Sequence, residues 1–221
     1  MIMMKRILII TAVLLLGHPA FGATLYDFET GVEGWTFQNY TDSQAISAVA
    51  QSSAQAVSGS YSLMGTTHLV PGDANYSKGE VLINRTAANA LDLNGLQTSV
   101  SVYAPAGAAG TNPSAPNGWQ MFFKDTNWKS WYGPWSNMTE NAWQSLSVTP
   151  GVTSPDFVDS GFDPTKIMVM GVKLGTGDAS TGTFDGAIYV DQYSVVPEPA
   201  SMLLLGSGLI GILGFARKKK A

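Results

Sequence analysis

The chain has 221 residues, and the stretch from 24 to 196 carries six cationic against fifteen acidic side chains, a net charge of −9. This balance argues against nucleic acid and anionic membrane surfaces as partners. The chain has no cysteine, and the same stretch has one histidine, His68, so it offers no thiol nucleophile and no thiolate or multi-histidine metal site.

The chain begins with the three-part order of a secretory signal peptide. Lys5 and Arg6 precede an apolar run at 7–16 that is too short to span a bilayer comfortably, and small residues follow at Ala20, Gly22 and Ala23. We therefore expect residues 1–23 to be removed on export, which leaves one domain at 24–195.

The stretch 24–195 shows short alternating or apolar runs separated by Gly, Pro, Asn and Asp, and no sustained helical period. The run at 167–174 is apolar on both faces and is expected to lie in the centre of a sheet. The predicted strands are Leu25–Glu29, Gly34–Phe37, Ile46–Val49, Gly59–Met64, Glu80–Arg85, Thr98–Ala104, Trp119–Lys124, Trp143–Val148, Ile167–Leu174 and Gly186–Val195.

This pattern predicts an all-β fold, an antiparallel β-sandwich, with a pure barrel as the alternative. The sandwich is preferred because the turns are unevenly spaced and two connecting loops, 105–118 and 151–165, exceed a dozen residues.

The C-terminal segment 196–221 has three parts: Pro197, Glu198 and Pro199, an apolar run at 200–216, and four cations at 217–220. The apolar run is long enough for a transmembrane helix, and the cations should stay on the cytoplasmic side. The segment closely resembles the PEP-CTERM sorting signal. The resemblance implies recognition of Pro-Glu-Pro by an exosortase, a transient inner-membrane intermediate, and delivery to the cell surface or matrix of an exopolysaccharide-producing Gram-negative bacterium.

The stretch 24–195 also resembles a jelly-roll (galactose-binding-like) carbohydrate-binding module, through Tyr26–Glu29, Gly34-Trp35, Gly59–Leu63, Trp143-Gln144 and Ile188–Ser194. In such modules, acidic residues near the first and last strands hold a structural calcium. The resemblance therefore implies calcium at Asp27, Glu29 and Asp191. Calcium prefers oxygen ligands of this kind, although solvated acids at strand edges are the alternative.

Tryptophan is concentrated between residues 119 and 135, and Trp128, Trp131 and Trp135 have polar or turn-forming neighbours. Flat aromatic rings suit the C–H faces of sugar rings, and polar side chains at the rim can bind hydroxyl groups. We therefore predict a saccharide site here, although such aromatic side chains also build cores. The remaining candidates are Tyr132, Gln120, Lys124 and Asp125.

The sequence thus predicts an exported, non-catalytic surface or matrix protein that binds polysaccharide. One alternative is a purely structural or adhesive protein without a saccharide site. A further alternative is a glycoside hydrolase, which needs two carboxylates facing each other across a cleft, and no sequence pattern marks such a pair.

Overall fold

The computed structural model describes residues 23–40, 43–71, 78–177 and 182–197. Residues Thr24–Val195 form one compact unit. The predicted transmembrane helix at 200–216, the Pro-Glu-Pro motif beyond Pro197 and all but the last residue of the predicted signal peptide lie outside the described residues. Within the described part of the chain, no helix has the length and apolar character needed to cross a bilayer.

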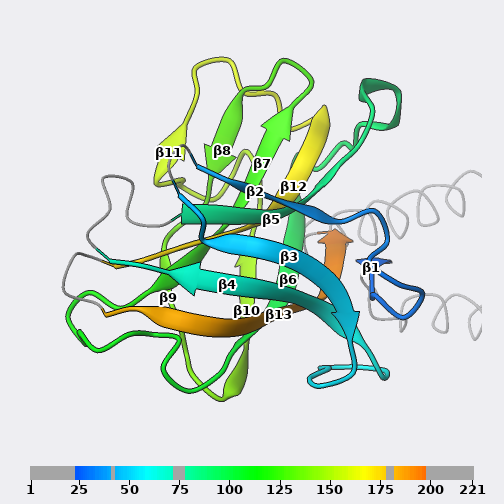
Figure 1. The fold of residues 1–221 in the computed structure, drawn as a ribbon. Helices are drawn as coiled ribbons and strands as arrows, with labels where there is room; N and C mark the ends of the chain where they lie inside the picture. The colour runs from blue at the N-terminus through cyan, green and yellow to red at the C-terminus, as the bar shows by residue number, and fades with distance from the viewer. Residues whose placement is uncertain (1–22, 41–42, 72–77, 178–181, 198–221) are drawn as a thin grey trace, which may run out of the picture. The chain divides into compact units, whose positions relative to one another are not determined.

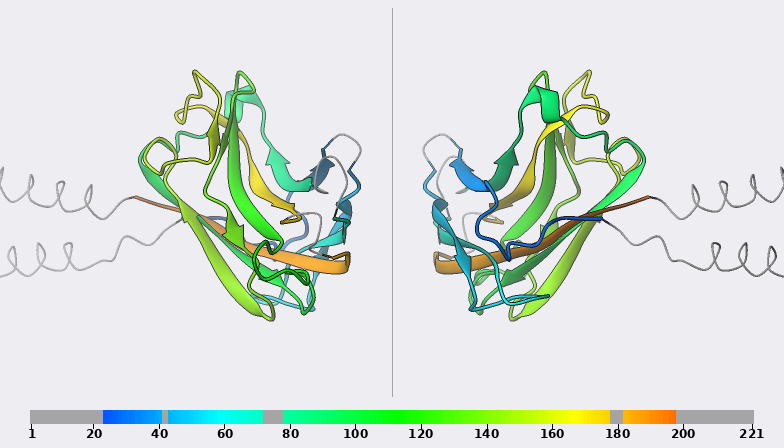
Figure 2. Two further views of the ribbon diagram at one scale, coloured as in Figure 1. Left: turned by 90° about the vertical axis from the view of Figure 1, so that its left-hand side faces the viewer. Right: turned by 90° about the vertical axis from the view of Figure 1, so that its right-hand side faces the viewer.

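The strands form two sheets, shown from three sides in Figures 1 and 2, and the strand pairs along both sheets run antiparallel. Sheet A has the order β10 (Ala142–Val148), β6 (Leu96–Ala104), β13 (Phe184–Pro197), β4 (Ser62–Leu69) and β3 (Ile46–Ser52), and β1 (Ala23–Tyr26) pairs with β13. Sheet B has the order β11 (Phe157–Val158), β8 (Ser130–Tyr132), β7 (Gly118–Asp125), β12 (Ile167–Gly175), β5 (Lys78–Asn84) and β2 (Thr36–Asn39), and β9 (Ser136–Asn137) pairs with β7.

The core lies between the two sheets, and sheet A turns one face to it. In β6, the buried side chains of Val100 and Val102 alternate with the half-buried side chains of Ser99, Ser101 and Tyr103. This alternation is expected of a strand with one buried and one solvated face. The structure confirms the predicted all-β antiparallel sandwich, and the two separate sheets exclude a single closed barrel.

Sheet B differs from sheet A because its two central strands are buried on both faces. Seven of the eight residues of β7 are buried, as are eight of the nine residues of β12. Strand β12 lies between β7 and β5, as its apolar sequence predicted. Because the core accounts for only one face of these strands, other parts of the chain must cover the opposite face.

The structure contains three short strands that the sequence did not predict: β8, β9 and β11. The segment 151–165, predicted as a loop, includes β11, which pairs with β8 at the edge of sheet B. These strands have two or three residues each, too few to show an alternating pattern. They build the edge of sheet B on the side of β7.

Candidate functional site

The face of sheet B that points away from the core, here called the outer face, combines a small apolar cluster with charged side chains. The cluster consists of Leu82, Phe122, Met168 and Val169, with Tyr132 packed against it. The alternate residues of β7, Trp119, Met121 and Phe123, belong to the core between the sheets. Alternation therefore places Glu80, Gln120, Lys124 and Lys173 on the outer face.

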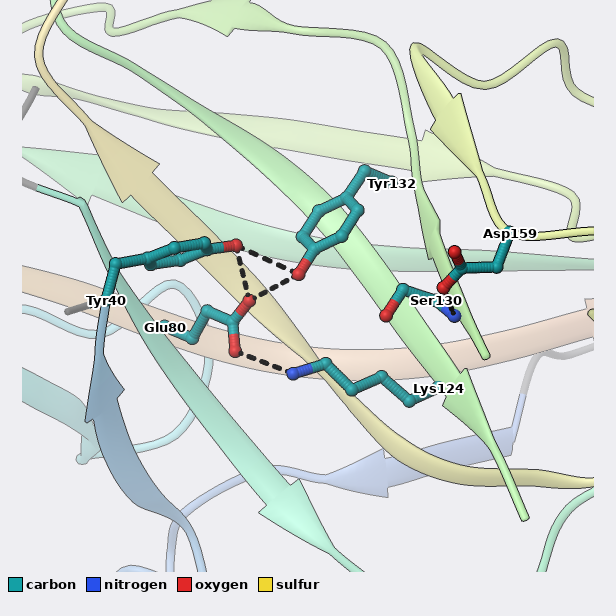
Figure 3. Close-up of polar contacts among 6 residues, drawn as sticks. All are labelled: Tyr40, Glu80, Lys124, Ser130, Tyr132 and Asp159. Carbon is teal, nitrogen blue, oxygen red and sulfur yellow. Dashed lines mark hydrogen bonds and ion pairs between the residues drawn. The ribbon is translucent and has the colours of Figure 1, made fainter. Parts of the chain in front are cut away.

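The Glu80 carboxylate, on β5, accepts three hydrogen bonds on the outer face (Figure 3). Its Oε1 atom accepts the hydroxyls of Tyr40, at 2.9 Å, and Tyr132, at 2.8 Å. Its Oε2 atom accepts the Lys124 ammonium at 3.2 Å. The Tyr40 hydroxyl also lies 2.9 Å from the Tyr132 hydroxyl. Glu80 is only 2% exposed, so these partners take the place of water.

The two tyrosines act here as neutral donors. Burial, followed by the negative charge of Glu80, raises the pKa of Tyr40 and of Tyr132 above the usual value for a phenol. Both hydroxyls therefore stay protonated through the physiological pH range, which suits donation to a carboxylate.

Lys173 lies beside this network. Its Nζ atom donates to Gln120 Oε1 at 2.8 Å and sits 4.9 Å from the Tyr132 ring centroid and 5.8 Å from that of Tyr40. Burial, followed by the charge of Lys78, lowers the pKa of Lys173 to about 8. Both effects disfavour the protonated amine.

A second set of hydrogen bonds fixes the segment that carries Trp135. Gln120 Nε2 donates to Gly133 O and to Asp156 Oδ2, each at 2.9 Å. The backbone N–H of Trp135 donates to the same Asp156 oxygen at 2.9 Å. The Trp135 indole lies over Gly118, where an added Cβ atom would meet the ring at 2.5 Å. Glycine at 118 is therefore what leaves room for this ring.

A cavity of about 470 Å³ opens beside this segment, within the size range of ligand sites in proteins. Its lining includes an aromatic ring, two ammonium groups, an amide and two hydroxyl groups. The lining includes the side chains of Lys78, Ser114, Trp135, Asn137, Lys173 and Thr176.

The structure separates the three tryptophans that the sequence grouped into one site. Trp135 is half-buried and lines the cavity. Trp128 is 59% exposed at the turn between β7 and β8. Trp131 is 2% exposed and packs against Phe123 in the core. Its prediction as a saccharide-binding residue is wrong, because its ring has no face open to a ligand.

The prediction that Asp125 binds saccharide is also corrected. Its side chain is fully buried and organises the turn between β7 and β8. Its Oδ1 atom accepts the backbone N–H groups of Asn127, at 2.8 Å, and Lys129, at 3.0 Å. Its Oδ2 atom accepts the backbone N–H of Asp163 at 2.9 Å. The outer face does carry three other predicted residues: Tyr132, Gln120 and Lys124. Their side chains form the hydrogen bonds described above.

Sequence reasoning missed several residues of this face: Tyr40, Lys78, Glu80, Asp156 and Lys173. A signal was available for two of them. Lys173 is the single charge in a strand that is otherwise apolar on both faces, and Glu80 opens a predicted strand that is otherwise mostly apolar. The two residues are direct partners across β12 and β5, so a correct pairing of these strands would have joined them.

Of the three acidic residues predicted to bind calcium, Asp191 and Glu29 contact one loop, whereas Asp27 Oδ1 accepts the backbone N–H of Glu29 at 3.1 Å. Asp191 Oδ2 accepts the backbone N–H of Val57 at 2.9 Å, and Glu29 Oε1 accepts those of Ser60 and Tyr61 at 2.9 Å. Burial, backed by the charge of Glu29, raises the pKa of Asp191. In the described ranges, no three histidine or acidic side chains are placed to hold a metal ion.

Comparison with protein families finds the PEP-CTERM protein-sorting motif at residues 195–219. No curated protein matches the chain in sequence. The family match confirms the sorting signal that was predicted from the Pro-Glu-Pro motif, the apolar run and the basic residues after it. The match concerns the C-terminal segment alone.

Comparison with solved structures finds carbohydrate-binding modules of the same fold. The family 11 module of a cellulosomal cellulase of Clostridium thermocellum has a TM-score of 0.55 at 12% identity, covering 81% of this chain and 96% of that one. A family 28 module specific for non-crystalline cellulose has a TM-score of 0.50 at 14% identity, covering 80% and 96%.

An exo-β-agarase structure also matches, with a TM-score of 0.50 at 11% identity, covering 82% of this chain and 26% of that one. At these identities the likeness shows a shared fold. The domain at 24–195 is therefore similar to jelly-roll carbohydrate-binding modules and carries a PEP-CTERM sorting motif after it.

Proposed function

We propose that this chain is an exported, non-catalytic protein that binds polysaccharide through the outer face of sheet B. The observation that carries the proposal is the cavity beside Trp135, where an aromatic ring lies among amide, hydroxyl and ammonium groups. An aromatic wall with a few polar groups is the general chemistry of saccharide recognition. The shared fold with carbohydrate-binding modules is consistent with this site.

Binding is favoured over hydrolysis by the hydrogen bonding of the Glu80 carboxylate on this face. Both oxygens of Glu80 accept hydrogen bonds, one from two tyrosines and the other from Lys124. A general acid in glycoside hydrolysis must instead hold its own proton toward the leaving oxygen. Release of reducing sugar from a bound polysaccharide would contradict the non-catalytic assignment.

We expect the Trp135→Ala variant to lose polysaccharide binding while keeping its fold. Removing a central aromatic contact costs about 2 kcal/mol or more, roughly thirtyfold in affinity. Trp143 provides a matched control, because it is also half-exposed but lies on sheet A, where it packs against Tyr103. Affinity electrophoresis of the full chain in non-ionic detergent, against a panel of neutral and acidic polysaccharides, measures both variants.

Equal loss of binding in Trp135→Ala and Trp143→Ala would contradict the assignment of the site to sheet B. Failure of the unaltered chain to bind any polysaccharide would favour the purely structural or adhesive alternative. Trp128 remains a predicted binding residue, and a weaker affinity in Trp128→Ala would extend the site to the turn between β7 and β8.

The sorting motif leads to a separate expectation about processing. We propose that an exosortase recognises Pro197, Glu198 and Pro199 and removes the C-terminal segment. Replacing the three residues with alanine should leave the chain uncleaved and held in the inner membrane. Immunoblotting of membrane and surface fractions from the producing bacterium tests this. Unchanged size and unchanged delivery of the variant would contradict it.

Calcium at Asp27, Glu29 and Asp191 also remains a proposal. Burial, with a smaller contribution from the charge of Glu29, raises the pKa of Asp191. A cation would offset both effects, with backbone carbonyls and water supplying further ligands. Adding a chelator should then lower the melting temperature, because an ion that binds only the native state stabilises it. An unchanged melting temperature would leave the carboxylates as acceptors for the loop at 57–61 alone.

A further inference from the structure

Phe157 is an exposed aromatic side chain on the outer face of sheet B. It lies in the edge strand β11, where its direct partner across the strand pair is Tyr132. Direct partners in a sheet project to the same face, and Tyr132 packs against the apolar cluster of the outer face. The Phe157 ring is 52% exposed, whereas the other phenylalanines that the structure describes are buried or half-buried. One aromatic ring therefore reaches solvent at the edge of the face proposed to bind polysaccharide.

Ring contacts connect Phe157 to the cavity. The centroid of its ring lies 6.1 Å from that of the Tyr132 ring. The Tyr132 centroid in turn lies 4.9 Å from the Nζ atom of Lys173, which lines the cavity. The distance from the Phe157 ring to this ammonium can therefore be no greater than the sum of these two distances. A single polysaccharide chain of a few sugar units is long enough to contact both.

Hydrogen bonds fix the segment that carries Phe157 beside the segment that carries Trp135. The backbone N–H of Asp156 donates to Tyr132 O at 3.0 Å. Asp156 Oδ2 accepts the backbone N–H of Trp135 and the side-chain amide of Gln120, each at 2.9 Å. These bonds do not involve the Phe157 side chain. Removing the ring should therefore leave the segment in place.

Exposure alone does not mark a binding residue, because folded proteins commonly expose single apolar side chains. The neighbouring Val158 is an example: it is 47% exposed, but its direct partner is Trp131, which belongs to the core. Its side chain is therefore on the opposite side of β11 from Phe157. Phe157 differs because it shares a face, and a ring contact, with the residues beside the cavity.

We propose that Phe157 is a second aromatic contact for the polysaccharide and stacks on a sugar unit of a chain that continues from the cavity to the edge of sheet B. This inference rests on the proposed function and names the class of saccharide that the site prefers: chains of several units over disaccharides. The cavity beside Trp135 holds one part of the chain. Phe157 adds affinity only when the chain extends beyond that part, because its flat ring suits the C–H face of a further sugar unit.

Calorimetric titration of the full chain in non-ionic detergent at pH 7 tests the preference for length. The probes are cello-oligosaccharides and agaro-oligosaccharides, each as a disaccharide and as a hexasaccharide. In the series that binds, we expect the hexasaccharide to bind at least about tenfold more tightly than the disaccharide. Affinity electrophoresis against the polysaccharide panel makes the same comparison of variants on long chains, so the test does not depend on these two series.

Variants at β11 locate the effect. Phe157→Ala should weaken binding of the hexasaccharide and of the retained polysaccharide by about five- to tenfold and leave binding of the disaccharide unchanged. Phe157→Tyr keeps a ring and should keep the affinity. Val158→Ala is the matched control, because it shortens an exposed apolar side chain in the same strand and should change neither affinity. Melting curves of the three variants check that β11 and its surroundings still fold.

The outcomes that overturn this inference differ from those that overturn the proposed function. A Phe157→Ala variant that binds the hexasaccharide and the polysaccharides like the unaltered chain, or no more weakly than Val158→Ala, would exclude Phe157 as a contact and leave the proposed function in place. Equal losses in Phe157→Ala and Phe157→Tyr would exclude stacking on the ring. Absence of binding to every oligosaccharide and polysaccharide would remove both the inference and the proposed function.

Discussion

The Trp131→Ala variant should lose about 3–5 kcal/mol of folding free energy, the cost expected when a large buried aromatic side chain is removed from a core. Trp131 is 2% exposed and belongs to the core cluster between the sheets. Its ring centroid lies 5.6 Å from that of Phe123, its partner across β7 and β8. The surrounding strands are paired on both sides, so they can close the resulting cavity only in part.

Trp128→Ala provides the contrast, because the same change of residue at a 59% exposed position should alter stability by no more than about 0.5 kcal/mol. The backbone adds a second test. Trp128 has a φ of 61°, a left-handed conformation that glycine adopts without strain. Trp128→Gly should therefore be more stable than Trp128→Ala, by up to about 1 kcal/mol.

Urea unfolding of the three variants, followed by intrinsic fluorescence and circular dichroism, measures these differences. A Trp131→Ala variant that unfolds at the same urea concentration as the unaltered chain would contradict the placement of this ring in the core. Such a result would also restore Trp131 as a candidate for ligand binding.

The fold could be predicted from the sequence because its main strands are long enough to show a pattern. Strands such as β6 alternate along their length, and β12 is apolar on both faces, which placed it in the middle of a sheet. The edge strands β8, β9 and β11 are two or three residues long. Their pairing is set by the turns and by contacts with distant parts of the chain, which local sequence does not specify.

The positions of the candidate residues could be predicted only in part from the sequence, and the misplaced residues have a common cause. The tryptophans lie close together in the sequence, which led to their prediction as one site. The face of sheet B on which each side chain lies, however, depends on the register across the turn between β7 and β8. In the structure, Trp131 pairs with Phe123 and points into the core, whereas Tyr132 pairs with Phe122 and points outward. A shift of one residue would exchange the two. The turn that sets this register is held by Asp125, which explains why that residue is buried rather than available to a ligand.

The remaining residues of the site come from separate parts of the chain. Tyr40 follows β2, Glu80 lies in β5, Tyr132 in β8 and Lys173 in β12. Their hydrogen bonds join residues up to 92 positions apart in sequence. No local sequence pattern can reveal such a network. An isolated charged residue in an apolar strand does indicate, however, that its buried side chain needs polar partners from elsewhere in the chain.

Glu80 is the residue whose replacement should disturb the outer face most. In Glu80→Gln, the amide keeps the shape of the side chain but removes the charge that Lys124 neutralises and replaces one acceptor oxygen with a donor. That amide group can turn toward the two tyrosine hydroxyls, which accept as well as donate, and its oxygen can face the Lys124 ammonium, so the expected loss comes mainly from the missing negative charge (Figure 3). Breaking a buried ion pair by removing one partner costs about 3–5 kcal/mol. Lys124 is 13% exposed and can turn toward water, so we expect a loss near the lower end, about 3 kcal/mol.

A double-mutant cycle with Lys124→Met separates the ion pair from the tyrosine contacts. If the pair acts as a unit, the combined variant should lose less folding free energy than the sum of the two single variants, by about 1–3 kcal/mol. Tyr132→Phe should cost only about 1–2 kcal/mol, because it removes one of the three donors and leaves the carboxylate charge paired. Urea unfolding at pH 7 measures all four variants. Additive losses in the cycle, or a Glu80→Gln variant as stable as the unaltered chain, would show that Glu80 and Lys124 do not hold the outer face together.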